Sequence, residues 1–124
     1  MAGSPDLRKI PGDQDLTASR IGFRDGQMRI VLSGRSSGTP RYTILLQGLR
    51  CFFDHGVVNG RPLVASWERG VGSFGWWLPR REMEEHFELH LTSREDATRN
   101  WFRAIARDMT CRPFIAEEDL NYPG

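Results

Sequence analysis

The chain has 124 residues, of which 39% are hydrophobic, and its formal net charge is +1. This length is enough for one domain with a core of its own, without metal ions or disulfides to support it. The balanced charge makes nucleic-acid binding an unfavoured function, because that function normally needs a concentrated basic surface. No apolar run approaches the length of a membrane-spanning helix, and residues 1–17 lack the apolar centre of a signal peptide, so a cytoplasmic protein is expected.

Both ends of the chain are polar. Residues 1–17 contain two prolines and three aspartates, and we expect them to be a polar leader with little fixed structure. Residues 18–114 are expected to form a single α+β domain. Residues 115–124, IAEEDLNYPG, are expected to be a solvated acidic tail.

The first part of the domain is predicted to consist of short strands. Asp25-Gly26 separates two runs that contain apolar residues, so strands over 20–24 and 27–33 are predicted to pair as a hairpin. Residues 42–54 predict either one long strand bent at Gly48 or two shorter strands.

The middle of the domain continues in the same way. Asn59-Gly60 predicts a second hairpin turn, and in the strand after it Leu63, Ala65 and Trp67 share one face. A further strand is predicted over residues 74–78, followed by a charged connection, PRREMEEH.

Residues 86–109 predict a strand followed by a helix. The strand places Phe87, Leu89 and Leu91 on its buried face and His86, Glu88 and His90 on its wet face. Ser93 is predicted to cap the helix, which has Glu95 and Asp96 in its first turn. The buried stripe of this helix is formed by Ala97, Trp101, Ala104 and Ile105, with Trp101 as its anchor. The expected fold is therefore α+β, with about seven short strands in a curved antiparallel sheet or partly open barrel and one C-terminal amphipathic helix.

The sequence FELHLTSREDATRNWFRAI, residues 87–105, resembles the end of pleckstrin-homology-like domains, in which a seven-stranded barrel is closed by such a helix. This resemblance implies a scaffold for protein or peptide recognition. Lipid-binding members carry several basic residues around the first hairpin, whereas RDGQMR here carries only Arg24 and Arg29. Phosphoinositide binding is therefore not expected.

An aromatic and basic cluster is the main candidate binding site. It consists of Phe74, Trp76, Trp77, Arg80 and Arg81. Tryptophan and arginine are enriched in binding hot spots, and adjacent tryptophans in a strand point to opposite faces, so one of them can be exposed for a ligand. The alternative is that both tryptophans are covered by the rest of the protein.

A second candidate surface is formed by Arg99, Arg103 and Arg107 on the outer face of the predicted helix, where they could meet an acidic partner. An ordinary wet helix face, with Glu95 paired to Arg99, explains the same pattern.

Motifs for catalysis or cofactor binding are weak. Gly70, Gly72 and Gly75 have the spacing of a dinucleotide-binding loop, but Pro79 follows where a helix would have to run. His86, Glu88 and His90 are metal-ligand types, yet the two histidines would lie about 13 Å apart along a strand. Cys51 and Cys111 are expected to be free thiols, although a disulfide between them stays open. We predict no catalytic residues, no metal and no cofactor.

These patterns favour a small non-catalytic binding or protein-interaction module that acts through an aromatic and basic surface, with another protein or a peptide as its partner. An immunity- or antidote-type inhibitor, which would engage a partner enzyme through the acidic tail or the arginines, is a second hypothesis. A small-ligand pocket within the curved sheet, with or without enzymatic activity, is a third.

Overall fold

The computed structural model describes residues 15–70, 78–94 and 98–120, apart from the side chain of Glu68. These residues form six strands and two short helices. The strands are β1 (Leu16–Arg24), β2 (Gln27–Gly34), β3 (Pro40–Asp54), β4 (Leu63–Arg69), β5 (Phe87–Ser93) and β6 (Trp101–Pro113), and the helices are α1 (Arg80–Glu85) and α2 (Ala116–Asp119). In neither helix is there a stretch long and apolar enough to cross a bilayer, within the residues described.

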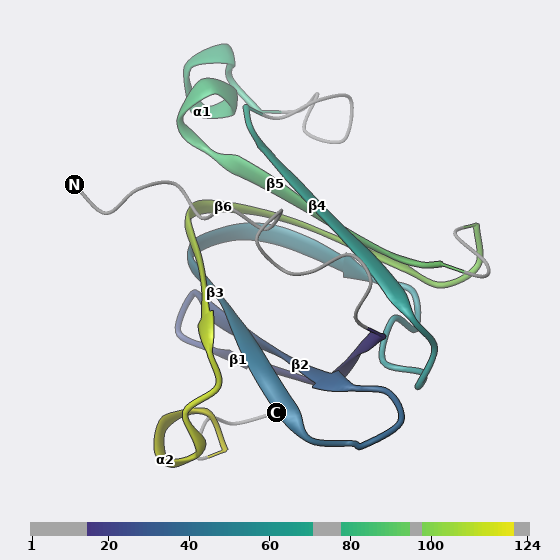
Figure 1. Ribbon diagram of the computed structural model, residues 1–124. Helices are drawn as coiled ribbons and strands as arrows, with labels where there is room; N and C mark the ends of the chain where they lie inside the picture. The colour runs from purple at the N-terminus through teal and green to yellow at the C-terminus, as the bar shows by residue number, and fades with distance from the viewer. Residues whose placement is uncertain (1–14, 71–77, 95–97, 121–124) are drawn as a thin grey trace.

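All six strands belong to one open antiparallel sheet with the order β1-β2-β3-β6-β5-β4. The long strands β3 and β6 run through the middle, and the sheet curves so that β1 and β2 lie in one layer and β4 and β5 in the other (Figure 1). The two edge strands, β1 and β4, approach each other. The predicted curved antiparallel sheet is thus confirmed, with six strands among the described residues instead of about seven.

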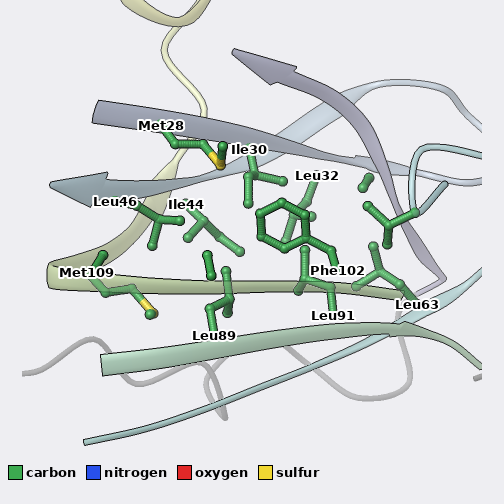
Figure 2. Packing of buried hydrophobic residues seen from close by; sticks show 14 of the residues in the cluster. Met28, Ile30, Leu32, Ile44, Leu46, Leu63, Leu89, Leu91, Phe102 and Met109 are labelled. Carbon is green, nitrogen blue, oxygen red and sulfur yellow. The ribbon is translucent and has the colours of Figure 1, made fainter. Parts of the chain in front are cut away.

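The core lies between the two layers. Because successive side chains of a strand point to opposite faces, every second residue enters this core. Met28, Ile30 and Leu32 point inward from β2, and Leu89 and Leu91 point inward from β5. Figure 2 shows these side chains around the ring of Phe102, which β6 contributes. Side chains therefore fill the interior of the curved sheet.

Residues 101–113 form a strand, so the predicted C-terminal amphipathic helix over 94–109 is wrong. In β6 the fully buried Phe102, Ala104 and Ala106 alternate with residues on the outer face, and Trp101 is only half-buried. Pairing decides the outcome, because β6 bonds to β3 along one edge and to β5 along the other, and these distant partners leave no local signature in the sequence. Ser93, the expected cap, is the buried last residue of β5.

The expected cap acids, Glu95 and Asp96, lie outside the described residues together with Ala97. The resemblance to pleckstrin-homology-like domains rests on a strand followed by a helix. In this protein the corresponding segments are two antiparallel strands, β5 and β6.

The first hairpin is confirmed, and the second is wrong. Asp25 and Gly26 turn between β1 and β2 with φ values of +50° and +77°. After β3, however, residues 55–62 lead to β4, which lies at the far edge of the sheet and, among the described strands, pairs with β5 alone. Asn59-Gly60 is therefore part of a connection between non-adjacent strands.

The charged connection PRREMEEH contains the short helix α1, which packs on the outer face of the sheet. Leu78 and Met83 cover the side chain of Ile105 there, next to Cys51. Of the strand predicted over 74–78, only Leu78 is among the described residues, and it is not in a strand.

The acidic C-terminal residues are not simply solvated, because Asp119 of α2 is only 1% exposed. Its Oδ1 accepts hydrogen bonds from Arg29 Nη1 and Arg112 Nη2, both at 2.8 Å. Its Oδ2 accepts from Thr43 Oγ1 at 2.6 Å, Ile115 N at 2.9 Å and Arg112 Nη1 at 3.1 Å. Although burial on its own would raise the pKa of Asp119, the bonds from Arg112, Thr43 and Ile115 hold this pKa well below its usual range. The carboxylate thus fixes α2 to the outer face of β2, β3 and β6.

Candidate functional site

The main predicted cluster lies mostly outside the described residues, which do not include Phe74, Trp76 and Trp77. Its two arginines, Arg80 and Arg81, are exposed in α1. Arg80 Nε lies 3.7 Å from Glu84 Oε1, in an ordinary surface pair one helical turn apart.

The helix on which the three arginines were predicted does not form. Arg99 lies in the turn before β6, while Arg103 and Arg107 belong to β6 itself. Arg103 Nε is 3.8 Å from a carboxylate oxygen of Glu88, and Arg107 Nη2 is 3.9 Å from one of Glu85. The expected helix face is therefore wrong, while binding of an acidic partner by these arginines stays a prediction.

A different candidate surface emerges at the second half of β3. β2 pairs with β3 no further than Leu46, whereas β3 continues to Asp54 with β6 as its partner. Beyond Leu46 the tip of the β1–β2 hairpin makes one backbone contact, in which Leu49 N donates to Gly26 O at 2.9 Å. From residue 50 to residue 54, no described strand lies along this edge of β3.

A bulge at the start of this segment separates it from the first half of β3. The register with β6 shifts between Leu49 and Cys51. Just before the shift, Gly48 has a φ of +64°, and a Cβ at this position would lie 2.8 Å from Arg107 Cβ. Glycine is thus needed here both for its backbone conformation and for the close approach of β6.

The hydrogen bond that His55 makes directly after β3 shows in which direction the backbone groups of residues 51–54 point. His55 N donates to Trp101 O at 2.8 Å across the β3–β6 pair. Because residues of an antiparallel strand face its two neighbours alternately, Cys51 and Phe53 also direct their backbone groups to β6. The backbone N–H and C=O groups of Phe52 and Asp54 point to the opposite edge, whereas Arg50 lies in the bulge, where the alternation is interrupted.

Exposed aromatic side chains flank that edge. Phe23 at the end of β1 is 49% exposed and Phe52 is 40% exposed, with ring centroids 6.0 Å apart. The Phe52 ring in turn lies 6.1 Å from that of the fully buried Phe102. The three rings form a row that leads from the surface into the core. We call residues 50–54 of β3 together with Phe23 the aromatic edge.

The aromatic character extends to the outer face of the sheet. Phe53 points to the side opposite Phe52 and is 52% exposed. Nearby on the same face, the rings of His55 and Trp101 stack with centroids 4.2 Å apart and an interplanar angle of 16°. Aromatic groups therefore lie on both sides of the edge.

The charges at the two ends of the aromatic edge are opposite. Arg50 Nη2 lies 3.4 Å from Glu82 Oε1 of α1, in a pair that is partly exposed. Asp54 Oδ1 accepts hydrogen bonds from the N–H groups of Gly56 and Val57 at 3.0 and 3.2 Å. Asp54 Oδ2 accepts none from a described residue.

Both cysteines are partly buried thiols. Burial raises the pKa of the Cys51 thiol, and burial raises that of the Cys111 thiol to about 11. Both are free cysteines, and both stay protonated at neutral pH, which makes them poor nucleophiles. Burial and the charge of Arg103 lower the pKa of His90, against the opposing effect of Glu88.

The three metal-ligand types near β5 do not share a wet face. His86 precedes the strand and is buried, with Nδ1 2.6 Å from Glu82 O, whereas Glu88 and His90 lie on the outer face. In the part of the chain that the structure describes, no three histidine, cysteine or acidic residues lie together as a metal site would require. Gly72 and Gly75 of the glycine motif lie outside the described residues.

Comparisons of the chain with family models, with curated proteins and with solved structures found no match. The resemblance to pleckstrin-homology-like domains consequently stays a prediction.

The sequence analysis did not single out Phe23, Phe52 or Phe53, although a usable signal was present. Adjacent phenylalanines near the end of a predicted strand must point to opposite faces, as must adjacent tryptophans. The predicted strands also differ in length, since 42–54 is longer than 27–33, the strand beside which it lies in the structure. This mismatch implies an unpaired edge at one end of the longer strand.

Proposed function

We propose that this protein is a non-catalytic interaction module that binds an extended protein segment along the aromatic edge. The observation that carries the proposal is the length of β3, which continues past the end of β2 and over residues 50–54 has β6 on one side and no described strand on the other. Open strand edges are templates for pairing, and proteins that do not use them usually blunt them with lysine, proline or a covering loop.

The side chains of the edge suit such a partner. In an added strand, alternate residues would contact the row of Phe23 and Phe52 on one side of the sheet and Phe53 on the other. Backbone hydrogen bonds to Phe52 and Asp54 would supply affinity that does not depend on sequence, and the aromatic rings would supply preference for apolar side chains. A segment with alternating apolar residues is the expected ligand.

This proposal is tested by selecting 12-residue peptides from a random displayed library on the wild-type protein and measuring their affinities by fluorescence anisotropy. We expect enriched peptides with apolar residues at every second position. Replacing Phe52 by Asp should weaken their binding by at least about tenfold, because a charge then lies where an apolar contact forms. N-methylation should abolish binding when it is placed on the alternate peptide residues whose N–H groups face β3. The same modification on the residues between them should leave binding intact.

Val64→Asp is the matched control. Val64 is also a half-exposed apolar residue on a strand, but it lies in β4 at the far edge of the sheet. Selected peptides that bind Phe52→Asp and wild type equally well would contradict the proposal.

A further inference from the structure

We infer that the outer face of the sheet carries a second binding site, which accepts short acidic segments of other proteins and is filled here by the chain's own helix α2 as a built-in ligand. The site is formed by the donor side chains of Arg20, Arg29, Thr43 and Arg112, which we call the arginine cradle. It lies at the covered half of β3 and does not depend on the function proposed for the aromatic edge.

Four neighbouring strands supply the arginine cradle. Arg20 of β1 lies opposite Val31 of β2, which lies opposite Thr43 of β3. Thr43 in turn lies opposite Arg112 of β6. Directly opposed residues of antiparallel strands point to the same face, so these side chains form one row across the sheet, and Arg29 joins it from two positions earlier in β2. α2 lies over this row, outside the layer that contains β1 and β2 (Figure 1).

Polar contacts hold α2 on the arginine cradle. Within residues 115–120 Asp119 is buried, whereas the apolar side chains of Ile115 and Leu120 are exposed. Burial of apolar surface by these two side chains therefore contributes little to the attachment. Recognition of an acidic group by clustered arginines, with few apolar contacts, is typical of sites that bind short peptide motifs.

The contacts with α2 define the segment that the arginine cradle accepts. Two guanidinium groups donate to the Asp119 carboxylate, and Arg112 Nη2 also donates to Glu118 Oε2 at 3.1 Å. Arg20 Nη1 donates to the backbone oxygen of Leu120 at 3.1 Å. The expected partner segment thus contains Glu-Asp, followed by a residue that is recognised through its backbone.

An arginine cradle without an acid is unfavourable, which favours the exchange of one acidic segment for another. The side chains of Arg29 and Arg112 are each 20% exposed, and Thr43 is fully buried. If α2 leaves, these guanidinium groups lose the charge of Asp119, and a carboxylate from a partner restores it. A neutral segment would not. Because α2 begins three residues after β6, it stays close to the arginine cradle and competes with every partner segment.

Peptide binding to a variant with a weakened built-in ligand tests this inference. Asp119→Asn keeps the shape of the side chain and removes its charge. A labelled peptide with the sequence of residues 114–120, FIAEEDL, is titrated against the full-length variant and the wild-type protein. We expect the variant to bind it at least about tenfold more tightly, because α2 then competes less well. The same peptide with Asp119→Asn should bind the variant at least about tenfold more weakly.

A second substitution shows where the peptide binds. In the Asp119→Asn background, Arg112→Gln should weaken binding by at least about tenfold, because the guanidinium contacts both acidic side chains of α2. Arg61→Gln, at an exposed position in the connection between β3 and β4, is the matched control and should leave binding unchanged. Equal affinities for the two peptides, or equal effects of the two arginine substitutions, would overturn the arginine cradle as a binding site.

Thermal unfolding gives a readout that does not require a stable variant. Saturating FIAEEDL should raise the Tm of Asp119→Asn, or restore its folded circular dichroism spectrum if the variant does not fold alone. The peptide with Asp119→Asn should do neither. A variant that responds to neither peptide would overturn the inference. Peptides selected for the aromatic edge are measured separately, so this result would leave the proposed function standing.

Discussion

The two halves of β3 differ in how completely they are paired and covered. Residues 40–46 have β2 on one side and β6 on the other, and Thr43, Ile44 and Leu46 are fully buried. Residues 50–54 have β6 alone among the described strands, and Phe52 and Phe53 are among the most exposed large apolar residues. One continuous strand thus serves as the centre of the fold at one end and as an open edge at the other. A strand that is longer than its neighbour therefore exposes a strand edge, and no additional strand or helix is needed to form that surface.

The largest expected effect lies on the covered half, at the carboxylate that fixes α2 over Thr43. Asp119→Ala should lower the free energy of unfolding by about 3 to 5 kcal/mol, because it leaves Arg29 and Arg112 without their buried partner. Denaturant titration measures this loss, with Glu117→Ala in the exposed part of the same helix as the control. A loss below about 1 kcal/mol would show that α2 does not depend on this network.

The same carboxylate predicts a dependence on pH. Its pKa is lowered in the folded protein, so its contribution is fully present above the ordinary aspartate pKa of about 4 and is lost as the pH falls through the lowered value. The stability difference between wild type and Asp119→Asn should therefore be constant above about pH 5 and shrink below about pH 4. Urea titrations at pH 7 and pH 3 would measure it, and an equal difference at both would contradict the lowered pKa.

A core truncation in the covered half should have the next largest effect. Ile44→Ala removes a fully buried side chain between the two layers and should cost about 2 to 4 kcal/mol in the free energy of unfolding.

Truncation in the open half should cost less. Phe52→Ala removes a ring that is 40% exposed, although it contacts Phe102, and we expect a loss of about 1 to 2 kcal/mol. Equal losses for Ile44→Ala and Phe52→Ala, measured by the same titration, would break the comparison between the two halves of β3.

The smallest effect is expected at α1. Arg80 is almost fully exposed and pairs with Glu84 in the same helix, so Arg80→Ala should change the free energy of unfolding by less than about 0.5 kcal/mol. Its binding to the selected peptides should also match the wild type, because the Arg80 guanidinium pairs with Glu84 and not with a residue of the aromatic edge. A marked loss of peptide binding would return attention to the aromatic and basic cluster that contains Arg80.

Local patterns predicted those elements whose signals are contained within a few residues. The Asp25-Gly26 turn and the alternation from Phe87 to Leu91 are examples, and both are confirmed. The conformation of the segment from Trp101 to Met109 was harder to predict, because Ala104 and Ile105 suit the buried stripe of a helix as well as a strand. Its conformation depends on pairing with β3 and β5, which lie far away in the chain.

The candidate surface depended on the same long-range information. The exposure of Phe52 follows from where β2 ends beside β3, and the burial of Asp119 follows from Arg29, Thr43 and Arg112 meeting on one face of the sheet. Neither meeting point leaves a motif in the sequence. The acidic composition of the C-terminal residues in particular suggested a solvated tail, since composition does not reveal a partner on a distant strand.

Amide hydrogen exchange across residues 51–54, recorded by NMR without and with a selected peptide, tests the central claim most directly. Without peptide the amides of Cys51 and Phe53 should be protected by β6, while that of Phe52 exchanges rapidly, and with saturating peptide the Phe52 amide should become protected as well. Strong protection of the Phe52 amide without peptide would mean that this edge is already covered within one chain, and the account of β3 as an open binding edge would be wrong.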